Sequence, residues 1–182
     1  MSEPVALWHA EHANFSRLLN VLEQQLALFH AGERPNYELM LDIVSYLRRY
    51  PDRFHHARED VAFARLAERD PGMQVKINRL LQEHRVIAKT GDELLALLNE
   101  VADEAIMSRA AVEAAAATYL VYYRHHLATE EREVMPRASK LLTKEDWAAV
   151  AAAVPAGRDP LFGDDSEGRY RELRRLIALE SG

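Results

Sequence analysis

The chain carries one short pattern twice, and that pattern restricts it to paired helices. Each copy is a Glu-His step followed by a His-x-x-x-Glu motif, and the histidines of a copy lie 43 residues apart in the first and 42 in the second. The copies consist of Glu11, His12, His55 and Glu59, and of Glu83, His84, His126 and Glu130. Because residues i and i+4 share one face of an α-helix, each His-x-x-x-Glu motif points two side chains at one spot. Two packed copies of one helical hairpin would be related by a pseudo-two-fold axis.

Helical periodicity extends over most of the chain. Glycine and proline are scarce and fall mostly between segments in which apolar residues recur every three or four positions. The predicted long helices cover residues 3–30, 36–69 and 71–101, and the fourth runs from 108 to about 136 or a little beyond. Pro51 should kink or break the second of them. Short connections between four long helices predict an all-α fold, an up-down-up-down four-helix bundle with additional short C-terminal helices.

The predicted bundle domain spans residues 1–142, and residues 143–182 form a helical extension. Thr143 can cap a short helix over residues 144–153, and an amphipathic helix is expected over residues 167–179. The apolar face of this last helix needs a cover, which is either the bundle or a partner subunit in a homodimer.

Composition excludes several kinds of site and partner. The 182 residues contain no cysteine, which excludes disulfides, thiolate catalysis, iron–sulfur ligation and cysteine zinc sites. A formal net charge of −6 argues against nucleic acid and against an anionic membrane surface as partners. The start of the chain has no basic, apolar signal segment, and the apolar stretch over residues 110–121 is too short to span a bilayer. We therefore expect a cytoplasmic protein without a nucleic-acid or membrane partner.

Six side chains of the repeat are the predicted metal ligands: His12, His55, Glu59, His84, His126 and Glu130. Two carboxylates can each bridge two ions, and each ion would also take two imidazoles. Imidazole and carboxylate ligands together suit iron, manganese or zinc, whereas structural zinc prefers a closed four-ligand site. Burying these groups without a metal would be costly. The set predicts two non-haem iron ions with an oxo or hydroxo bridge, with manganese or zinc as substitutes.

Adjacent histidines allow two registers in the first His-x-x-x-Glu motif. Either His55 with Glu59 or His56 with Asp60 has a suitable spacing. We favour the first pair because apolar residues seven and eleven positions after His55 lie on its helix face. His56 projects about 100° away, and it is expected, like His125, to lie beside the ligands rather than among them.

The neighbours of the predicted ligands carry further expectations. Glu11 and Glu83 each precede a ligand histidine and are expected to face outward. Three tyrosines lie one or two turns before the last histidine ligand: Tyr119, Tyr122 and Tyr123. Core packing is the favoured role for them, and the alternative is a hydrogen bond to a metal-bound group, for which Tyr119 and Tyr122 are better placed.

These motifs resemble the hemerythrin-like, or HHE cation-binding, family. The matching segments are Glu11-His12, HHARED at 55–60, Glu83-His84 and HHLATEEREVMP at 125–136. They cover roughly residues 5–140. The resemblance implies a four-helix bundle with a non-haem di-iron centre that binds dioxygen or related small molecules.

The chain departs from two subgroups of that family. Oxygen carriers have a fifth histidine one turn from the ligand of the third helix, where this chain has Leu80 and Ala88, and an aspartate where it has Glu131. The ligand set is more similar to that of iron–sulfur-cluster repair proteins, which usually carry a cysteine-bearing N-terminal segment.

Several functions are compatible with such a site. We expect a protein that binds or senses dioxygen, nitric oxide or peroxide. The alternatives are an enzyme that reduces nitric oxide or peroxide, a protein that repairs iron–sulfur clusters or donates iron, and a metal-free structural bundle. Two imidazoles at each iron would leave both ions an open position, which favours reactivity over reversible carriage. No motif for an electron donor accompanies the site, so the sequence does not assign an enzyme activity.

Overall fold

The computed structural model describes residues 3–102, 109–154, 157–163 and 168–180, and no strand occurs in these ranges. The α-helices are α1 (Glu3–His30), α2 (Tyr37–Arg49), α3 (His56–Arg69), α4 (Gln74–Ala102), α5 (Arg109–Thr129), α6 (Met135–Leu141), α7 (Lys144–Ala153) and α8 (Arg171–Glu180). Shorter turns are the π-helical η1 (Pro51–His55) and η3 (Glu130–Val134) and the 3₁₀-helical η2 (Pro71–Met73) and η4 (Gly168–Tyr170). The predicted all-α class is therefore confirmed. Among the described helices, none has the length and apolar character needed to cross a membrane.

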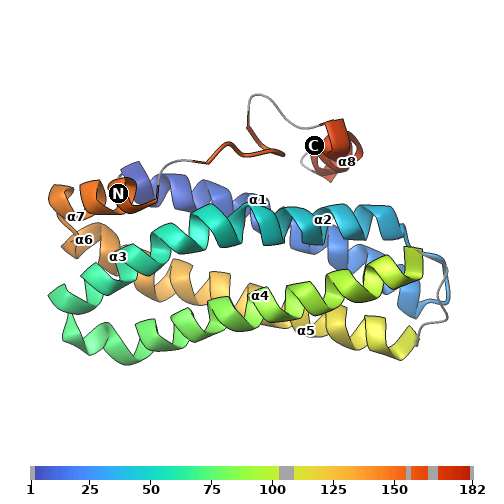
Figure 1. Cartoon of the computed structure of the whole chain (residues 1–182), viewed down its shortest axis with the longest axis horizontal. Helices are drawn as coiled ribbons and strands as arrows, with labels where there is room; N and C mark the ends of the chain where they lie inside the picture. The colour runs from blue at the N-terminus through green and yellow to red at the C-terminus, as the bar shows by residue number, and fades with distance from the viewer. Residues whose placement is uncertain (1–2, 103–108, 155–156, 164–167, 181–182) are drawn as a thin grey trace.

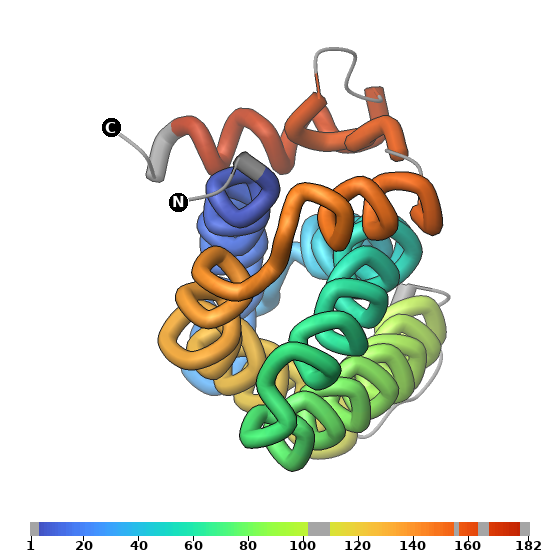
Figure 2. The backbone as a smooth tube through the Cα atoms, turned by 90° about the vertical axis from the view of Figure 1, so that its left-hand side faces the viewer, coloured from blue at the N-terminus to red at the C-terminus, as the bar shows by residue number. Residues whose placement is uncertain are grey.

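Four long helical segments lie side by side (Figure 1). The segments are α1, α2 continued through η1 into α3, α4, and α5 continued through η3 into α6. Seen from one end in Figure 2, they surround a common interior, with α7 and α8 on the outside. Each predicted long helix therefore corresponds to one segment.

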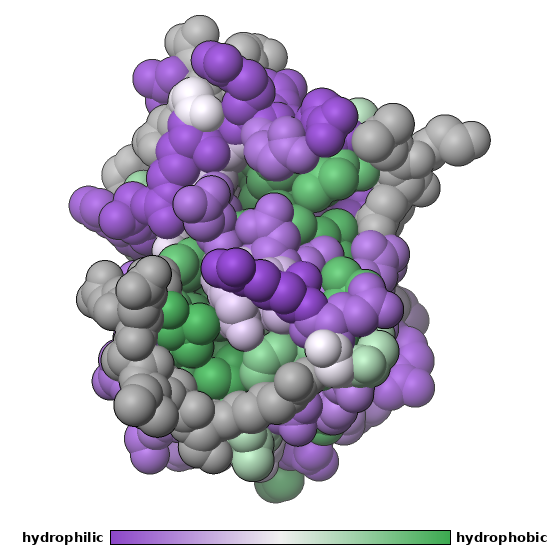
Figure 3. Space-filling model, turned by 90° about the vertical axis from the view of Figure 1, so that its right-hand side faces the viewer, coloured by the Kyte–Doolittle hydropathy of each residue, from purple (hydrophilic) through white to green (hydrophobic). Residues whose placement is uncertain are grey.

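Two apolar clusters fill the interior, and a polar layer separates them. On α1, Trp8 belongs to one cluster and Phe15 to the other, with His12 between them. On α4, Leu80 belongs to the same cluster as Trp8, and Ile87 belongs to the same cluster as Phe15. At the bundle end shown in Figure 3, apolar side chains are visible among hydrophilic ones. The layer between the clusters is where the polar residues of the repeat lie.

Two π-helical turns interrupt the second and fourth segments. Pro51 begins η1, so the predicted interruption is a widened turn, after which α3 continues the segment. Pro136 lies at the start of α6, where a missing backbone N–H costs little, and the fourth segment therefore continues a little beyond it to Leu141, as the sequence predicts. His55 ends η1 and Glu130 begins η3. Single π-helical turns are frequent at functional sites, and here both carry predicted ligands.

The C-terminal helices pack on the long segments. Thr143 caps α7 in a capping box with Asp146, as the sequence predicts, and Asp146 pairs with Arg69 of α3. Leu173 and Ile177 of α8 join the apolar cluster that contains residues of α1 and α2. The apolar face of α8 is thus covered within the chain, while the division into two domains stays a prediction.

Candidate metal centre

The six predicted ligands meet in the polar layer, and all are buried. His12 comes from α1, His55 from η1, Glu59 from α3, His84 from α4, His126 from α5 and Glu130 from η3. None of these residues exposes more than 8% of its surface. Every long helical segment thus contributes at least one of them.

The first imidazole pair faces both carboxylates. Nε2 of His12 and Nε2 of His55 are 2.8 Å apart. They lie 3.5 Å and 3.1 Å, respectively, from Oε1 of Glu59. Nε2 of His12 is also 3.6 Å from Oε2 of Glu130. Two nitrogen ligands about 2.1 Å from one ion are about 3.0 Å apart when they subtend a right angle, so this spacing suits a shared ion.

The second imidazole pair repeats the arrangement with the other carboxylate oxygens. Nε2 of His126 lies 3.0 Å from Oε1 of Glu130. Nε2 of His84 lies 3.7 Å from the same oxygen and 3.6 Å from Oε2 of Glu59. Each carboxylate therefore presents one oxygen to each imidazole pair, as a carboxylate that bridges two ions would.

Several atoms at this centre lack a hydrogen bond within the described part of the chain. They are both carboxylate oxygens of Glu59 and of Glu130, and Nε2 of His84 and of His126. Buried polar atoms without such partners are costly. Imidazole nitrogen and carboxylate oxygen together form a donor set that suits iron, manganese or zinc. The residues therefore fit a metal centre, because the atoms left over are the ones that metal ions would need.

Each predicted imidazole ligand also directs its Nδ1 to an outer carboxylate. The Nδ1–oxygen distances are 2.9 Å for His12 and Glu131, 2.7 Å for His55 and Glu11, 2.7 Å for His84 and Asp60, and 3.2 Å for His126 and Glu83. When Nδ1 donates its proton to a carboxylate, the tautomer that leaves Nε2 free is favoured and the ring is held in place.

The outer carboxylates follow the repeat. Glu11 and Glu83, each one residue before a ligand histidine, contact the histidine of the next segment. Asp60 and Glu131 each follow a predicted bridging glutamate. The expectation that Glu11 and Glu83 face outward is wrong, because each exposes only 7% of its surface. The missed signal was the recurrence of an acidic residue at the same place in both copies.

The carboxylates control the protonation of the centre. Burial lowers the pKa of His12, but the nearby carboxylates of Glu131 and Glu59 outweigh it and raise this pKa to about 10. Burial raises the pKa of Glu59, but the charge of His55 and contacts with other histidines hold it well below its usual value. Without metal, the protons of the charged His12 imidazole therefore face an ionised carboxylate, that of Glu59. Metal ions must displace those protons, so their binding strengthens as the pH rises.

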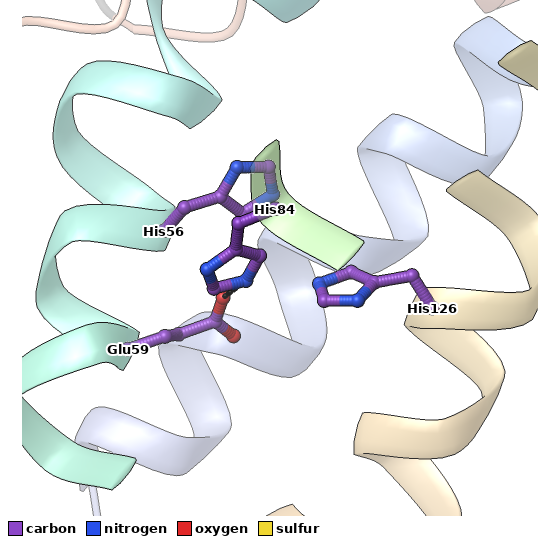
Figure 4. Close-up of side chains that lie close together, drawn as sticks. All are labelled: His56, Glu59, His84 and His126. Atoms are coloured by element: carbon purple, nitrogen blue, oxygen red, sulfur yellow. Dashed lines mark ion pairs between the residues drawn. The ribbon is translucent and has the colours of Figure 1, made fainter. Parts of the chain in front are cut away.

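His56 also lies within the cluster, although the sequence placed it beside the ligands. Its ring stacks on that of His84, with centroids 4.4 Å apart and planes at 16°. Its Nδ1 lies 2.9 Å from Oδ1 of Asp52. Figure 4 shows His56 converging with Glu59, His84 and His126, and each of the four offers an atom within 4.8 Å of the others.

The tyrosines near the end of α5 divide between core and surface. Tyr119 and Tyr123 are fully buried, whereas Tyr122 exposes 43% of its surface. The ring of Tyr123 lies 5.9 Å from that of His56. The prediction that Tyr122 is well placed near the site is therefore wrong, and Tyr123 is the tyrosine closest to a histidine of the cluster among the three.

A surface depression of about 390 Å³ lies between α1 and α5. Its lining residues are His9, His12, Ala13, Ser16, Arg124, Leu127, Ala128 and Glu131. Since His12 is among them, the depression reaches one histidine of the first imidazole pair.

Comparison with known proteins agrees with this geometry. The family model described as hemerythrin HHE cation binding domain matches residues 3–138. The match includes all six predicted ligands and ends before α7. A search of curated proteins found no match.

Proposed function

Because the chain belongs to the hemerythrin HHE cation-binding domain family, we propose that it is a non-haem di-iron protein that binds or senses dioxygen, nitric oxide or peroxide. The observation that carries this proposal is the position of Glu59 and Glu130, each of which faces both imidazole pairs. We further propose that the four long segments form an up-down-up-down four-helix bundle in a cytoplasmic protein, with no nucleic-acid or membrane partner.

The donor set supports iron over a structural zinc ion. A structural zinc site is usually closed by four ligands, whereas this centre offers two carboxylates between two pairs of imidazoles. Two irons joined by an oxo or hydroxo bridge would supply redox chemistry and a position for a small ligand. Manganese or zinc would occupy the same ligands as substitutes.

The chain itself orients the ligands and buries all six of them. The outer carboxylates hold the imidazole rings, and apolar clusters lie on both sides of the layer. The burial of all six ligands supports a retained ion, and therefore argues against the alternative of iron donation to damaged clusters. Reduction of nitric oxide or peroxide by the same centre is the enzymatic alternative.

Metal analysis and optical spectroscopy of anaerobically purified protein test the proposal. We expect two irons per chain and, on titration with oxygen or nitric oxide, a charge-transfer band that reverses when the gas is removed. His55→Ala and His126→Ala should abolish iron binding, whereas His125→Ala, beside His126 but half exposed, should retain it. Steady consumption of nitric oxide or peroxide would indicate an enzyme instead. Iron-free protein that is indifferent to the first two substitutions would refute the di-iron proposal.

A further inference from the structure

A second surface depression, of about 430 Å³, lies beside the junction of α2 and η1. Four arginines line it: Arg48, Arg49, Arg53 and Arg158. The other lining residues are Tyr50, Phe54 and Pro160, so none of the described residues around the depression is acidic. The whole chain has a net charge of −6, and this concentration of positive charge runs against that balance. Such a patch attracts anions.

Two of the arginines carry charges that no carboxylate compensates in the described part of the chain. Arg49, at the end of α2, and Arg53, within η1, are exposed and form no ion pair with a described residue. The guanidinium carbon of Arg53 lies 5.4 Å from the centroid of the Phe54 ring, which orients the group. Like charges four positions apart along a helix repel each other. An anion bound to both guanidinium groups would remove that repulsion.

Arg48 supports the wall of the depression. Its Nε and Nη2 each donate a hydrogen bond of 2.8 Å to a carboxylate oxygen of Asp92, and it also pairs with Asp52. Its side chain packs against Gly91, where an added Cβ would lie 2.5 Å from Cδ of Arg48. The charge of Arg48 is therefore already compensated, and we expect Arg49 and Arg53 to bind the anion.

The loop that contributes Arg158 and Pro160 is fixed to the bundle. Oδ1 of Asp159 accepts a hydrogen bond from the backbone N–H of Leu161 at 2.8 Å, and Oδ2 accepts one from the hydroxyl of Tyr46 at 3.0 Å. Leu161 is itself fully buried in an apolar cluster. Since Arg158 and Pro160 flank Asp159, the depression lies between parts of the chain that are fixed relative to each other.

The charge and size of the depression favour an organic phosphate. A guanidinium group donates two parallel hydrogen bonds to a phosphate group, and two guanidinium groups match the charge of about −2 of a phosphate monoester at neutral pH. The volume of about 430 Å³ falls within the range of small-molecule sites, roughly 300–1,000 Å³, and exceeds what one phosphate group needs. Tyr50, Phe54 and Pro160 supply carbon surface for the rest of the molecule.

We propose that this depression binds a small organic phosphate, whose phosphate group is held by Arg49 and Arg53. Arg158 completes the site from the loop. The proposal does not depend on the di-iron function, because none of the six predicted metal ligands lines the depression.

Isothermal titration calorimetry of the full chain tests the site with phenyl phosphate as the probe. We expect one phenyl phosphate per chain, bound at least about tenfold more tightly than inorganic phosphate or benzoate. Arg49→Gln and Arg53→Gln should each weaken binding at least about tenfold, because each removes a charge-assisted pair of hydrogen bonds. Arg65→Gln is the matched control: this arginine of α3 lies outside the depression and pairs with Glu68, so the same change of net charge should leave binding unaltered.

Thermal melting provides a second measurement and shows whether the variants fold. Phenyl phosphate should raise the melting temperature of the wild type and of Arg65→Gln, but not that of the variant carrying both Arg49→Gln and Arg53→Gln. Absence of binding to the wild type, or equal weakening in Arg65→Gln, would overturn the proposal. Inorganic phosphate or benzoate that binds as tightly as phenyl phosphate would overturn the choice of an organic phosphate. Tighter binding of poly-glutamate to the same arginines would assign the depression to an acidic protein partner instead.

Discussion

Glu11 is the outer carboxylate whose replacement should weaken metal binding most clearly. Oε2 of Glu11 accepts a hydrogen bond from Nδ1 of His55 at 2.7 Å, and Oε1 accepts one from the hydroxyl of Tyr50 at 3.0 Å. Arg58 lies 3.4 Å from the same Oε1. Burial raises the pKa of Glu11, but His55 and Arg58 lower it further, so the group is ionised at neutral pH. Glu11→Gln keeps the shape and an acceptor but removes the charge.

The size of the effect follows from burial. Removing the partner of a ligating histidine typically costs about 10- to 100-fold in metal affinity, which corresponds to about 1.4 to 2.7 kcal/mol. Glu11 is 7% exposed, so its charge is poorly screened and the upper part of that range is expected. Asp60 makes the equivalent contact with His84, but its side chain is 52% exposed. Water screens that charge, and Asp60→Asn should cost less than about tenfold.

Competition with a ferrous chelator under anaerobic conditions measures both variants. The two substitutions remove the same charge from the same position on a histidine, so Asp60→Asn is the matched control for burial. Thermal unfolding of the metal-free proteins shows whether either variant has lost its fold. Equal losses of iron affinity in the two variants, or no loss in Glu11→Gln, would refute the reasoning.

Three further outcomes are expected. Metal-free protein should lose thermal stability as the pH rises from about 6.5 to about 10. The carboxylates around His12 stabilise the fold only while its imidazole is protonated, and the raised pKa extends that state to about pH 10. A flat profile in a pH series of melting curves would contradict this. Iron affinity should instead increase as the pH rises, because fewer protons then compete for the imidazoles. Chelator competition at several pH values measures this affinity. Thr143→Ala should lower the free energy of unfolding by about 1 kcal/mol in urea titrations, since it removes the N-cap of α7, and Thr118→Ala on the exposed face of α5 is the control.

Helical periodicity and the repeat were enough to predict the long helices and the meeting point of six side chains, because both depend on spacing along one helix. What spacing could not supply was the packing of one segment against another. Glu11 lies about 100° from His12 on its helix, which suggested an outward position. In the structure that direction meets the second segment, and Glu11 reaches His55 there.

The same limit explains His56 and Tyr122. His56 lies one position from His55 and was placed beside the site for that reason, yet α4 packs on that side and brings His84 against its ring. On α5, the apolar and polar faces are weakly distinguished in an alanine-rich sequence, so the pattern did not separate exposed Tyr122 from buried Tyr123. The π-helical turns were equally hidden, because a shift of one hydrogen bond leaves no residue pattern of its own beyond the nearby prolines.

The contacts between the two copies make the centre a product of their packing. Asp60 of the first hairpin holds His84 of the second, and Glu131 of the second holds His12 of the first. The predicted bridging glutamates likewise each face imidazoles from both hairpins. Neither hairpin alone contains a complete ligand set with its outer carboxylates, so a preformed site requires the assembled bundle. Binding of metal therefore stabilises the packing of the two halves, and the free energy of binding contributes directly to the free energy of folding.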